Sequence, residues 1–322
     1  MNYKKAGAVA IPTLIAAGII IYMLWRVWDD LLIALKTAIP SFLLLAILIC
    51  IAAWFLRGFR YQYILKKLEV FIDVWKSTAC IYVSQTANLI IPARLGDLVR
   101  LFILKNIAGA TYSRGLSSIV VERFFDVFTI ALLGAIVLPY ALEMPKWFSS
   151  VISAALALCF IFMLLIALFG NLKTENKYLK IILNLISEIK QASLNLSALA
   201  GIGFLSIVIW IFDCIVCYVI ALMFNTNIPF VTIILAIVIG NLVKAVPLTP
   251  GGVGTYELAV ALTLEVSGTP AAIATLIAVI DHLVKNLVTL IGGIISLYVF
   301  GEWAFDLLKR AFSRGIDKGE IV

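Results

Sequence analysis

One short stretch of the sequence has residue types that could bind a phosphate. In NLIIPARLGDLVRLF (Asn88–Phe102), Arg94 and Arg100 flank Gly96 and Asp97 between two apolar runs. A guanidinium holds a phosphate through two parallel hydrogen bonds. A helix that begins after Gly96 would also point free N–H groups and its positive dipole end at the same place. The stretch predicts an anion-binding break between two helices. Alternatively, both arginines are interfacial side chains of a shallow loop, with Asp97 as a local partner.

A second break of this kind follows in PLTPGGVG. Prolines end helices, and glycines allow a left-handed backbone and the close approach of a ligand. Lys244 precedes this break without an acidic residue close to it in the sequence. Glu257 follows the break, where it could pair with Lys244 or stabilise the first turn of the next helix. The residues of the break expected at the binding site are Pro250, Gly251, Gly252 and Gly254.

Each break is followed by an apolar segment with ionisable residues at positions i, i+1 and i+4. Ionisable residues inside such segments are functional candidates by default. The first set could contact a substrate, or it could be a structural ion-pair network. The second set and Asp213 are candidates for coupling, although a neutral buried imidazole is the alternative for the only histidine. The two sets are Glu122, Arg123 and Asp126, and Asp281, His282 and Lys285.

The elements that position these residues must lie in a membrane. The chain has 322 residues, of which 63% are hydrophobic and 13% charged, and a mean hydropathy of +1.11. Such values are typical of multi-pass membrane proteins. We expect one integral domain over 1–322, a retained first span, and no attached soluble module. The net charge of +7 is not interpreted as a nucleic-acid surface, because most lysines and arginines lie in short loops.

Apolar runs and loop charges predict the topology. Runs of spanning length occur near 6–25, 38–56, 116–141, 148–170, 197–223 and 271–299. Basic residues in the loops 57–76, 105–114 and 171–195 place these loops, and both termini, in the cytoplasm. The segments 77–107 and 230–266 must then each leave and return on one side. We therefore expect an all-α polytopic membrane protein of the cytoplasmic membrane, with about six spanning helices and two oppositely oriented re-entrant helical hairpins.

The two halves of the chain also resemble each other. Each has a span, a hairpin whose break is preceded by an Asn-Leu pair, and a span with an ionisable set. We expect an inverted repeat, with repeat 1 at about 38–141, a linking span at 148–170, repeat 2 at about 197–299 and a cytoplasmic tail at 300–322. In transporters of this plan the binding site lies near the midplane, between broken helices.

No cofactor and no metal site is expected. The five cysteines lie in apolar segments and are interpreted as buried thiols, because no set of histidine or acidic partners surrounds them. They are Cys50, Cys80, Cys159, Cys214 and Cys217.

The motifs NLIIPARLGDLVRLFIL, SSIVVERFFDVF and PLTPGGVGTYELAV, in this order, resemble the transmembrane, flippase-like region of lysylphosphatidylglycerol synthetases. The resemblance covers about 57–297. Asp97 departs from the family's usual glutamate at this position. The resemblance implies translocation of an anionic lipid or a lipid-linked intermediate, in a stand-alone member without the aminoacyl-transfer domain.

The sequence therefore favours a flippase or scramblase that binds the anionic headgroup of a membrane lipid, and not an enzyme. Three alternatives stay open. They are an ion-coupled transporter of a small anionic solute, a membrane enzyme acting on a lipid phosphate, and a non-transporting accessory subunit of a lipid or glycan synthase. Association as a homo-oligomer or with a lipid-modifying enzyme also stays open.

Overall fold

The computed structural model describes residues 3–90, 92–140, 145–172, 174–246 and 248–301, and every regular element in these ranges is helical. The all-α class is confirmed. The helices are α1 (Tyr3–Arg26), α2 (Trp28–Lys36), α3 (Ser41–Lys67), α4 (Val74–Ile90), α5 (Val99–Ala108), α6 (Tyr112–Val137), α7 (Lys146–Phe169), α8 (Lys177–Ser193), α9 (Leu196–Met223), α10 (Phe230–Ala245), α11 (Thr255–Val266) and α12 (Ala271–Phe300), with the short 3₁₀ helices η1 (Pro92–Leu98), η2 (Leu138–Tyr140) and η3 (Pro250–Gly252).

Four of the described helices are long and apolar enough to cross a membrane, namely α3, α7, α9 and α12. Helix α6 is long enough, but its ionisable residues interrupt the apolar run. The apolar helical segment Pro12–Arg26 of α1 is shorter than a full span. The polytopic class is therefore supported, and crossings by α1 and α6 stay predictions.

Both predicted breaks are sharp reversals of the chain. Helix α4 returns through η1 into α5, and α10 returns through η3 into α11. Gly96 packs so closely on α4 that a Cβ there would lie 2.5 Å from the Asn88 nitrogen, and a Cβ at Gly240 would lie 2.9 Å from the Tyr256 ring. Helical hairpins at these two places are thus present, while their depth in a bilayer and the inverted repeat stay proposals.

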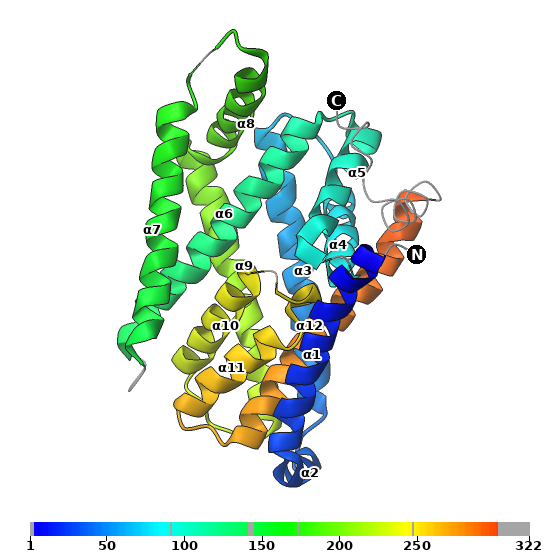
Figure 1. Cartoon of the computed structure of the whole chain (residues 1–322), viewed down its shortest axis with the longest axis vertical. Coiled ribbons are helices and arrows are strands. Elements are labelled where there is room, and N and C mark those ends of the chain that lie inside the picture. The colour runs from blue at the N-terminus through cyan, green and yellow to red at the C-terminus, as the bar shows by residue number, and fades with distance from the viewer. Residues whose placement is uncertain (1–2, 91, 141–144, 173, 247, 302–322) are drawn as a thin grey trace.

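The two hairpins occupy opposite ends of the molecule and meet at their tips. Figure 1 shows α4 and α5 in the upper part and α10 and α11 in the lower part. The tips are in contact, since a Cβ on Gly251 of η3 would lie 3.0 Å from Leu89 of α4. The breaks therefore lie next to each other near the centre of the fold.

Glycines let α4 approach its neighbours closely. A Cβ at Gly293 of α12 would lie 2.7 Å from the Thr86 Cβ, and one at Gly58 of α3 would lie 2.9 Å from the Thr78 Cβ. The Thr86 hydroxyl donates to the Thr289 carbonyl at 2.9 Å. Small residues at helix contacts favour such packing in membranes, where no hydrophobic effect draws helices together. Helix α4 is thus held between α3 and α12.

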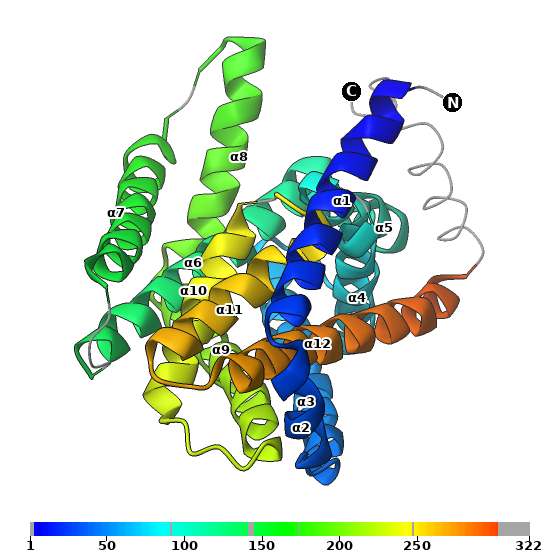
Figure 2. The same ribbon diagram turned by 60° about the horizontal axis from the view of Figure 1, so that its bottom comes forward.

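Loops gather at two ends. At one end, Lys67 donates to the Ser197 hydroxyl at 2.7 Å, and Arg114 pairs with Glu69 at 2.9 Å. The Ser113 hydroxyl also donates to Glu188 at 2.6 Å, so that the contacts at this end bring together the three loops for which a cytoplasmic position was predicted. Figures 1 and 2 show α8 projecting from this end of the molecule.

Different contacts close the other end. Arg26 at the end of α1 pairs with Glu265 of α11 at 2.5 Å, and the Ile39 N–H donates to the Met223 carbonyl at 2.8 Å. The structure thus separates two sets of loops as the charge pattern predicted. Which set faces the cytoplasm stays a prediction, and residues 302–322 of the predicted cytoplasmic tail lie outside the described residues.

The segment 171–195, treated above as a basic connector, contains the helix α8. The Asn176 side chain caps its first turn by accepting the Tyr178 and Leu179 N–H groups. Asparagine at this position stabilises a helix start by satisfying otherwise unpaired donors. Asn176 is visible in the sequence as a candidate helix start, but the charges of this segment alone predicted only its side of the membrane and not its helix.

Candidate functional site

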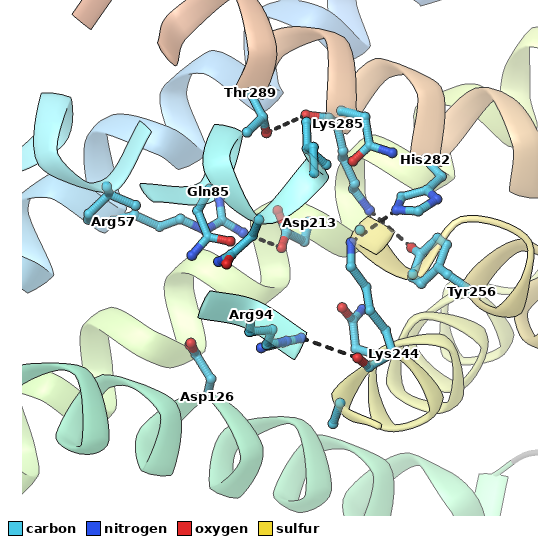
Figure 3. Close-up of a pocket in the computed structure, with 18 of the residues that line it drawn as sticks. Arg57, Gln85, Arg94, Asp126, Asp213, Lys244, Tyr256, His282, Lys285 and Thr289 are labelled. Carbon is cyan, nitrogen blue, oxygen red and sulfur yellow. Dashed lines mark hydrogen bonds and ion pairs between the residues drawn. The ribbon is translucent and has the colours of Figure 1, made fainter. Parts of the chain in front are cut away.

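A cavity of about 190 Å³ lies where the two hairpin tips meet. Its wall includes residues of α3, α4, η1, α6, α9, α10, η3, α11 and α12. Figure 3 shows charged side chains from several of these elements, including Arg57, Arg94, Lys244 and Lys285. Elements far apart in the sequence thus build one polar space inside a largely apolar molecule.

Arg100, predicted at the binding site, lies behind the wall of the cavity in a buried ion-pair network. Its side chain is fully buried, and its Nη1 lies 2.5 Å from the Glu122 Oε2. Arg60 of α3 is paired in the same region with Asp126, at 2.6 Å between Nη1 and Oδ1. These pairs join α5, α6 and α3. Glu122 and Asp126 therefore have structural partners, although both also line the cavity.

Asp97 holds the first hairpin together. Its Oδ1 accepts hydrogen bonds from the Gln85 and Asn88 side-chain amides of α4, at 3.1 and 3.0 Å. Arg123 of α6 lies 3.3 Å from the same carboxylate, and Arg100 lies 3.5 Å from it. Because four donors converge on one carboxylate, Asp97 fixes η1 against both α4 and α6.

Two cations of the cavity wall stand outside these pairs. Within the described residues, Arg94 and Lys244 have no carboxylate oxygen within 4.0 Å. The Arg94 Nη2 donates to the Lys244 backbone carbonyl at 3.3 Å, and this bond connects the two hairpin tips (Figure 3). Lys244 was suspected from its lack of an acidic neighbour in the sequence, and the folded chain also leaves it without one.

Lys244 is instead the first member of a hydrogen-bonded chain. Its Nζ lies 3.0 Å from the His282 Nε2, and the His282 Nδ1 lies 2.8 Å from the Glu257 Oε1. An ammonium only donates, so Nε2 accepts and the ring proton resides on Nδ1, which donates to Glu257. The other Glu257 oxygen accepts the Gly254 N–H at 2.7 Å. Glu257 thus stabilises the start of α11, as expected, and contacts Lys244 only through His282.

The remaining candidates for coupling are paired. The Lys285 Nζ lies 2.8 Å from the Asp281 Oδ1, and the Tyr256 hydroxyl donates to the Asp281 Oδ2 at 2.7 Å. Asp213 of α9 pairs with Arg57 of α3. Of these five side chains, Asp281 alone is absent from the cavity wall.

The glycines divide by role. Gly251 and Gly252 have positive φ values of 63° and 77° and line the cavity with Pro250. Gly254 (φ 83°) instead lies against α1, where a Cβ would be 3.0 Å from the Ala16 carbonyl oxygen. Gly96 packs on α4 and is also absent from the wall.

Several residues of the wall were not predicted. Arg57 and Arg60 were counted as loop charges after a span ending at 56, but α3 continues to Lys67. The stretch contains neither proline nor an adjacent pair of helix breakers, and this continuity could have placed both arginines inside the fold. The polar side chains that the prediction missed include Arg57, Arg60, Tyr256, Gln85, Asn88, Asn241 and Asn286.

The wall carries an excess of positive charge. Of the described residues that line the cavity, six are lysines or arginines and three are aspartates or glutamates, with His282 neutral. One arginine and three acidic residues lie directly behind the wall. With these four charges included, the excess of positive charge falls to one. The four residues are Arg100, Asp97, Glu257 and Asp281. A cavity with this balance attracts an anion and repels a second cation.

Comparison with known proteins identifies the family of the chain. The sequence model of the family described as the lysylphosphatidylglycerol synthase TM region matches residues 9–293. The glycosyltransferase AglD of Haloferax volcanii is 30% identical over 315 residues, covering 84% of this chain and 50% of that protein. This chain thus spans about half the length of AglD.

Two other relatives match over nearly their whole length. A UPF0104 membrane protein of Methanocaldococcus jannaschii is 27% identical over 222 residues, covering 66% of this chain and 93% of that protein. A UPF0104 membrane protein of Methanothermobacter thermautotrophicus is 24% identical over 316 residues, covering 90% of this chain and 93% of that protein.

Proposed function

The chain belongs to the family of the lysylphosphatidylglycerol synthase transmembrane region, and from this premise we propose that it translocates a lipid with an anionic headgroup across the membrane. The headgroup binds in the cavity between the hairpin tips while the hydrocarbon tails stay in the bilayer. The family and the similarity to a protein named a glycosyltransferase support the broader class, a membrane protein that handles lipids or glycans.

The observation that carries the proposal is the pair Arg94 and Lys244. Taking a charge out of water without a partner of opposite sign costs several kcal/mol. Among the described residues, both cations lack a carboxylate partner while the five other cations around the cavity have one. An anionic headgroup would supply the missing charge and would hydrogen-bond to both side chains.

Movement of the headgroup requires that the two tips separate. Only one hydrogen bond between described side chains and backbone joins η1 to α10, the 3.3 Å contact from Arg94 to the Lys244 carbonyl. A phosphate that binds Arg94 would compete for this donor. Ligand binding would therefore loosen the contact between the hairpins and expose the cavity to the opposite leaflet, as in transporters built on broken helices.

The test is translocation in liposomes that contain the purified protein and traces of acyl-labelled fluorescent lipid. Dithionite bleaches only labels in the outer leaflet, so translocation appears as bleaching beyond that fraction. We expect faster bleaching of labelled phosphatidylglycerol than of zwitterionic phosphatidylcholine. Arg94→Gln should slow the anionic probe roughly tenfold or more, since a hydrogen bond to a charged group contributes about 1.5–3 kcal/mol.

The matched control is Arg114→Gln, which removes a partly exposed arginine that pairs with Glu69 outside the cavity. It should leave translocation unchanged. If neither lipid moves faster than in protein-free liposomes, but the same vesicles take up labelled inorganic phosphate, the transporter of a small anion replaces this proposal. That the chain is not itself an enzyme stays a prediction, because AglD is named a glycosyltransferase and the match covers half of it.

A further inference from the structure

Four side-chain amides line the cavity, and their carbonyl oxygens cannot bind the phosphate of a phosphodiester, which only accepts hydrogen bonds. They are Gln85 and Asn88 of α4, Asn241 of α10 and Asn286 of α12. Asn88 and Asn241 are the asparagines of the two Asn-Leu pairs that precede the breaks. The same residue type therefore reaches the cavity from both hairpins.

The orientation of the first two amides follows from their partner. The Gln85 Nε2 and the Asn88 Nδ2 lie 3.1 and 3.0 Å from the Asp97 Oδ1. A carboxylate oxygen accepts hydrogen bonds from its neighbours, so the NH₂ group of each amide must face it. Each amide then keeps its carbonyl oxygen free. Asn88 is only 8% exposed, and its Oδ1 is covered by Gly96, so among the described residues it has no hydrogen-bond partner and it is not accessible from the cavity.

The other two amides agree with this pattern. The Asn241 Nδ2 donates to the Ile237 backbone carbonyl at 2.8 Å, which again fixes the NH₂ group and leaves Oδ1 free. Asn286 makes no hydrogen bond to any residue that the structure describes. The cavity therefore presents up to three acceptor oxygens, those of Gln85, Asn241 and Asn286, because the Asn88 oxygen is covered by Gly96. The first two are oriented by the bonds of their NH₂ groups.

Acceptor oxygens away from bulk water call for donors, because a buried polar group without a hydrogen-bond partner destabilises the folded state. A phosphodiester has no donor, and neither do lipid tails. An ammonium group is a donor, but it would add a positive charge to a wall that already has an excess of it. Hydroxyl groups donate without adding charge. The number of acceptors exceeds the two hydroxyls of a glycerol headgroup.

We propose that the headgroup translocated by this protein is a polyhydroxylated ring, a sugar or cyclitol, attached through a phosphodiester. The phosphate lies at Arg94 and Lys244, and the ring hydroxyls donate to Gln85, Asn241 and Asn286. The single negative charge of a phosphodiester matches the excess of one positive charge in the whole cluster. This inference rests on the proposed function, since it names the substrate class of the same cavity.

A series of lipids with the same charge and different numbers of headgroup hydroxyls tests the proposed polyhydroxylated headgroup. Acyl-labelled phosphatidylinositol, phosphatidylglycerol and phosphatidylethanol each carry one phosphodiester, with many, two and no headgroup hydroxyls respectively. We expect the rates of translocation to fall in this order in the dithionite assay. Phosphatidylinositol should move roughly tenfold or more faster than phosphatidylethanol, because several neutral hydrogen bonds separate the two.

Two variants connect the preference to the amides. Asn286→Leu and Asn241→Leu remove acceptors while keeping the branched shape and the number of side-chain heavy atoms, and each should reduce the ratio of the phosphatidylinositol rate to the phosphatidylethanol rate severalfold. Asn286 has no hydrogen bond to any described residue, so its variant should fold as the parent does. The matched control is Asn106→Leu on the exposed surface of α5, which should keep the full ratio.

The outcomes separate the two proposals. Equal rates for all three anionic lipids, or a preference that survives both leucine variants, would overturn the hydroxyl inference and leave anionic-lipid translocation standing. Faster movement of phosphatidylethanolamine than of phosphatidylethanol would assign the acceptors to an ammonium group and also overturn it. No acceleration of any anionic lipid over phosphatidylcholine would overturn the proposed function itself.

Discussion

Glu122 and Lys244 show how burial and partners decide what an ionisable residue does. Both occur in apolar stretches, and the sequence marked both as candidates for binding. In the folded chain Glu122 neutralises Arg100 and is 3% exposed, while among the described residues the Lys244 ammonium has only His282 as a hydrogen-bond partner. Residue type and spacing do not separate these two situations, because the partners come from elements distant in the sequence.

Breaking the buried ion pair of Glu122 and Arg100 should lower the stability of the folded protein. Glu122→Gln leaves Arg100 as a buried charge with a weakened partner, and breaking such a pair typically costs about 3–5 kcal/mol. We expect a clearly lower midpoint of thermal unfolding in detergent. Glu265→Gln is the control, because its partner Arg26 is 37% exposed and surface pairs contribute about 0–1 kcal/mol. Equal shifts for the two variants would contradict a structural role of Glu122.

At the scale of elements, the two breaks were predictable because few residue types can form them. Proline and glycine end helices for steric reasons that act locally, so PARLG and PGGVG identified both hairpins. The extension of α3 beyond residue 56 was not predicted. Helix α3 continues through its charged residues because Arg57 and Arg60 find Asp213 and Asp126 on other helices. Tertiary partners of this kind cannot be identified from one sequence.

A substitution at Gly252 tests whether the backbone of the second hairpin tip positions the Lys244 side chain. Its φ of 77° disfavours a side chain by roughly 1–2 kcal/mol, and an added Cβ would lie 2.6 Å from the Lys244 Cγ. Gly252→Ala should therefore displace Lys244 and slow translocation of anionic lipid severalfold. Gly109→Ala carries the same kind of backbone cost (φ 61°) with nothing within 4 Å, so it should lower stability similarly and leave the rate unchanged. Equal rates in the two variants would refute the displacement of Lys244.

At the scale of the whole molecule, the charges of the loops predicted which loops share an end. Arg114 and Lys67 bind residues of neighbouring loops at one end, and Arg26 binds Glu265 at the other. The distribution of lysines and arginines among the loops is visible in the sequence without knowledge of any contact, which explains why this feature was predictable. The cavity was predictable only as a meeting of two tips, since its amides and arginines come from six different helices.

Orientation in the membrane has a direct test. All five cysteines are buried, so a single exposed cysteine can be detected against a low background. Lys105→Cys should react with a membrane-impermeant maleimide only in inverted vesicles, and Asn227→Cys only in intact cells, because the positive-inside rule places the basic end in the cytoplasm. The reverse pattern would invert the predicted orientation. Reaction of both from the same side would contradict the separation of the loops into two ends.

The backbone of Arg94 has a consequence for laboratory evolution. Its φ of 55° is left-handed, as is that of Gly252 at the matching position of the other break, and glycine adopts this conformation with much less strain. A library sorted for heat resistance alone would therefore enrich glycine at position 94 and remove a cavity cation with it. Selection for heat resistance would favour glycine at position 94, whereas selection for activity would favour arginine there.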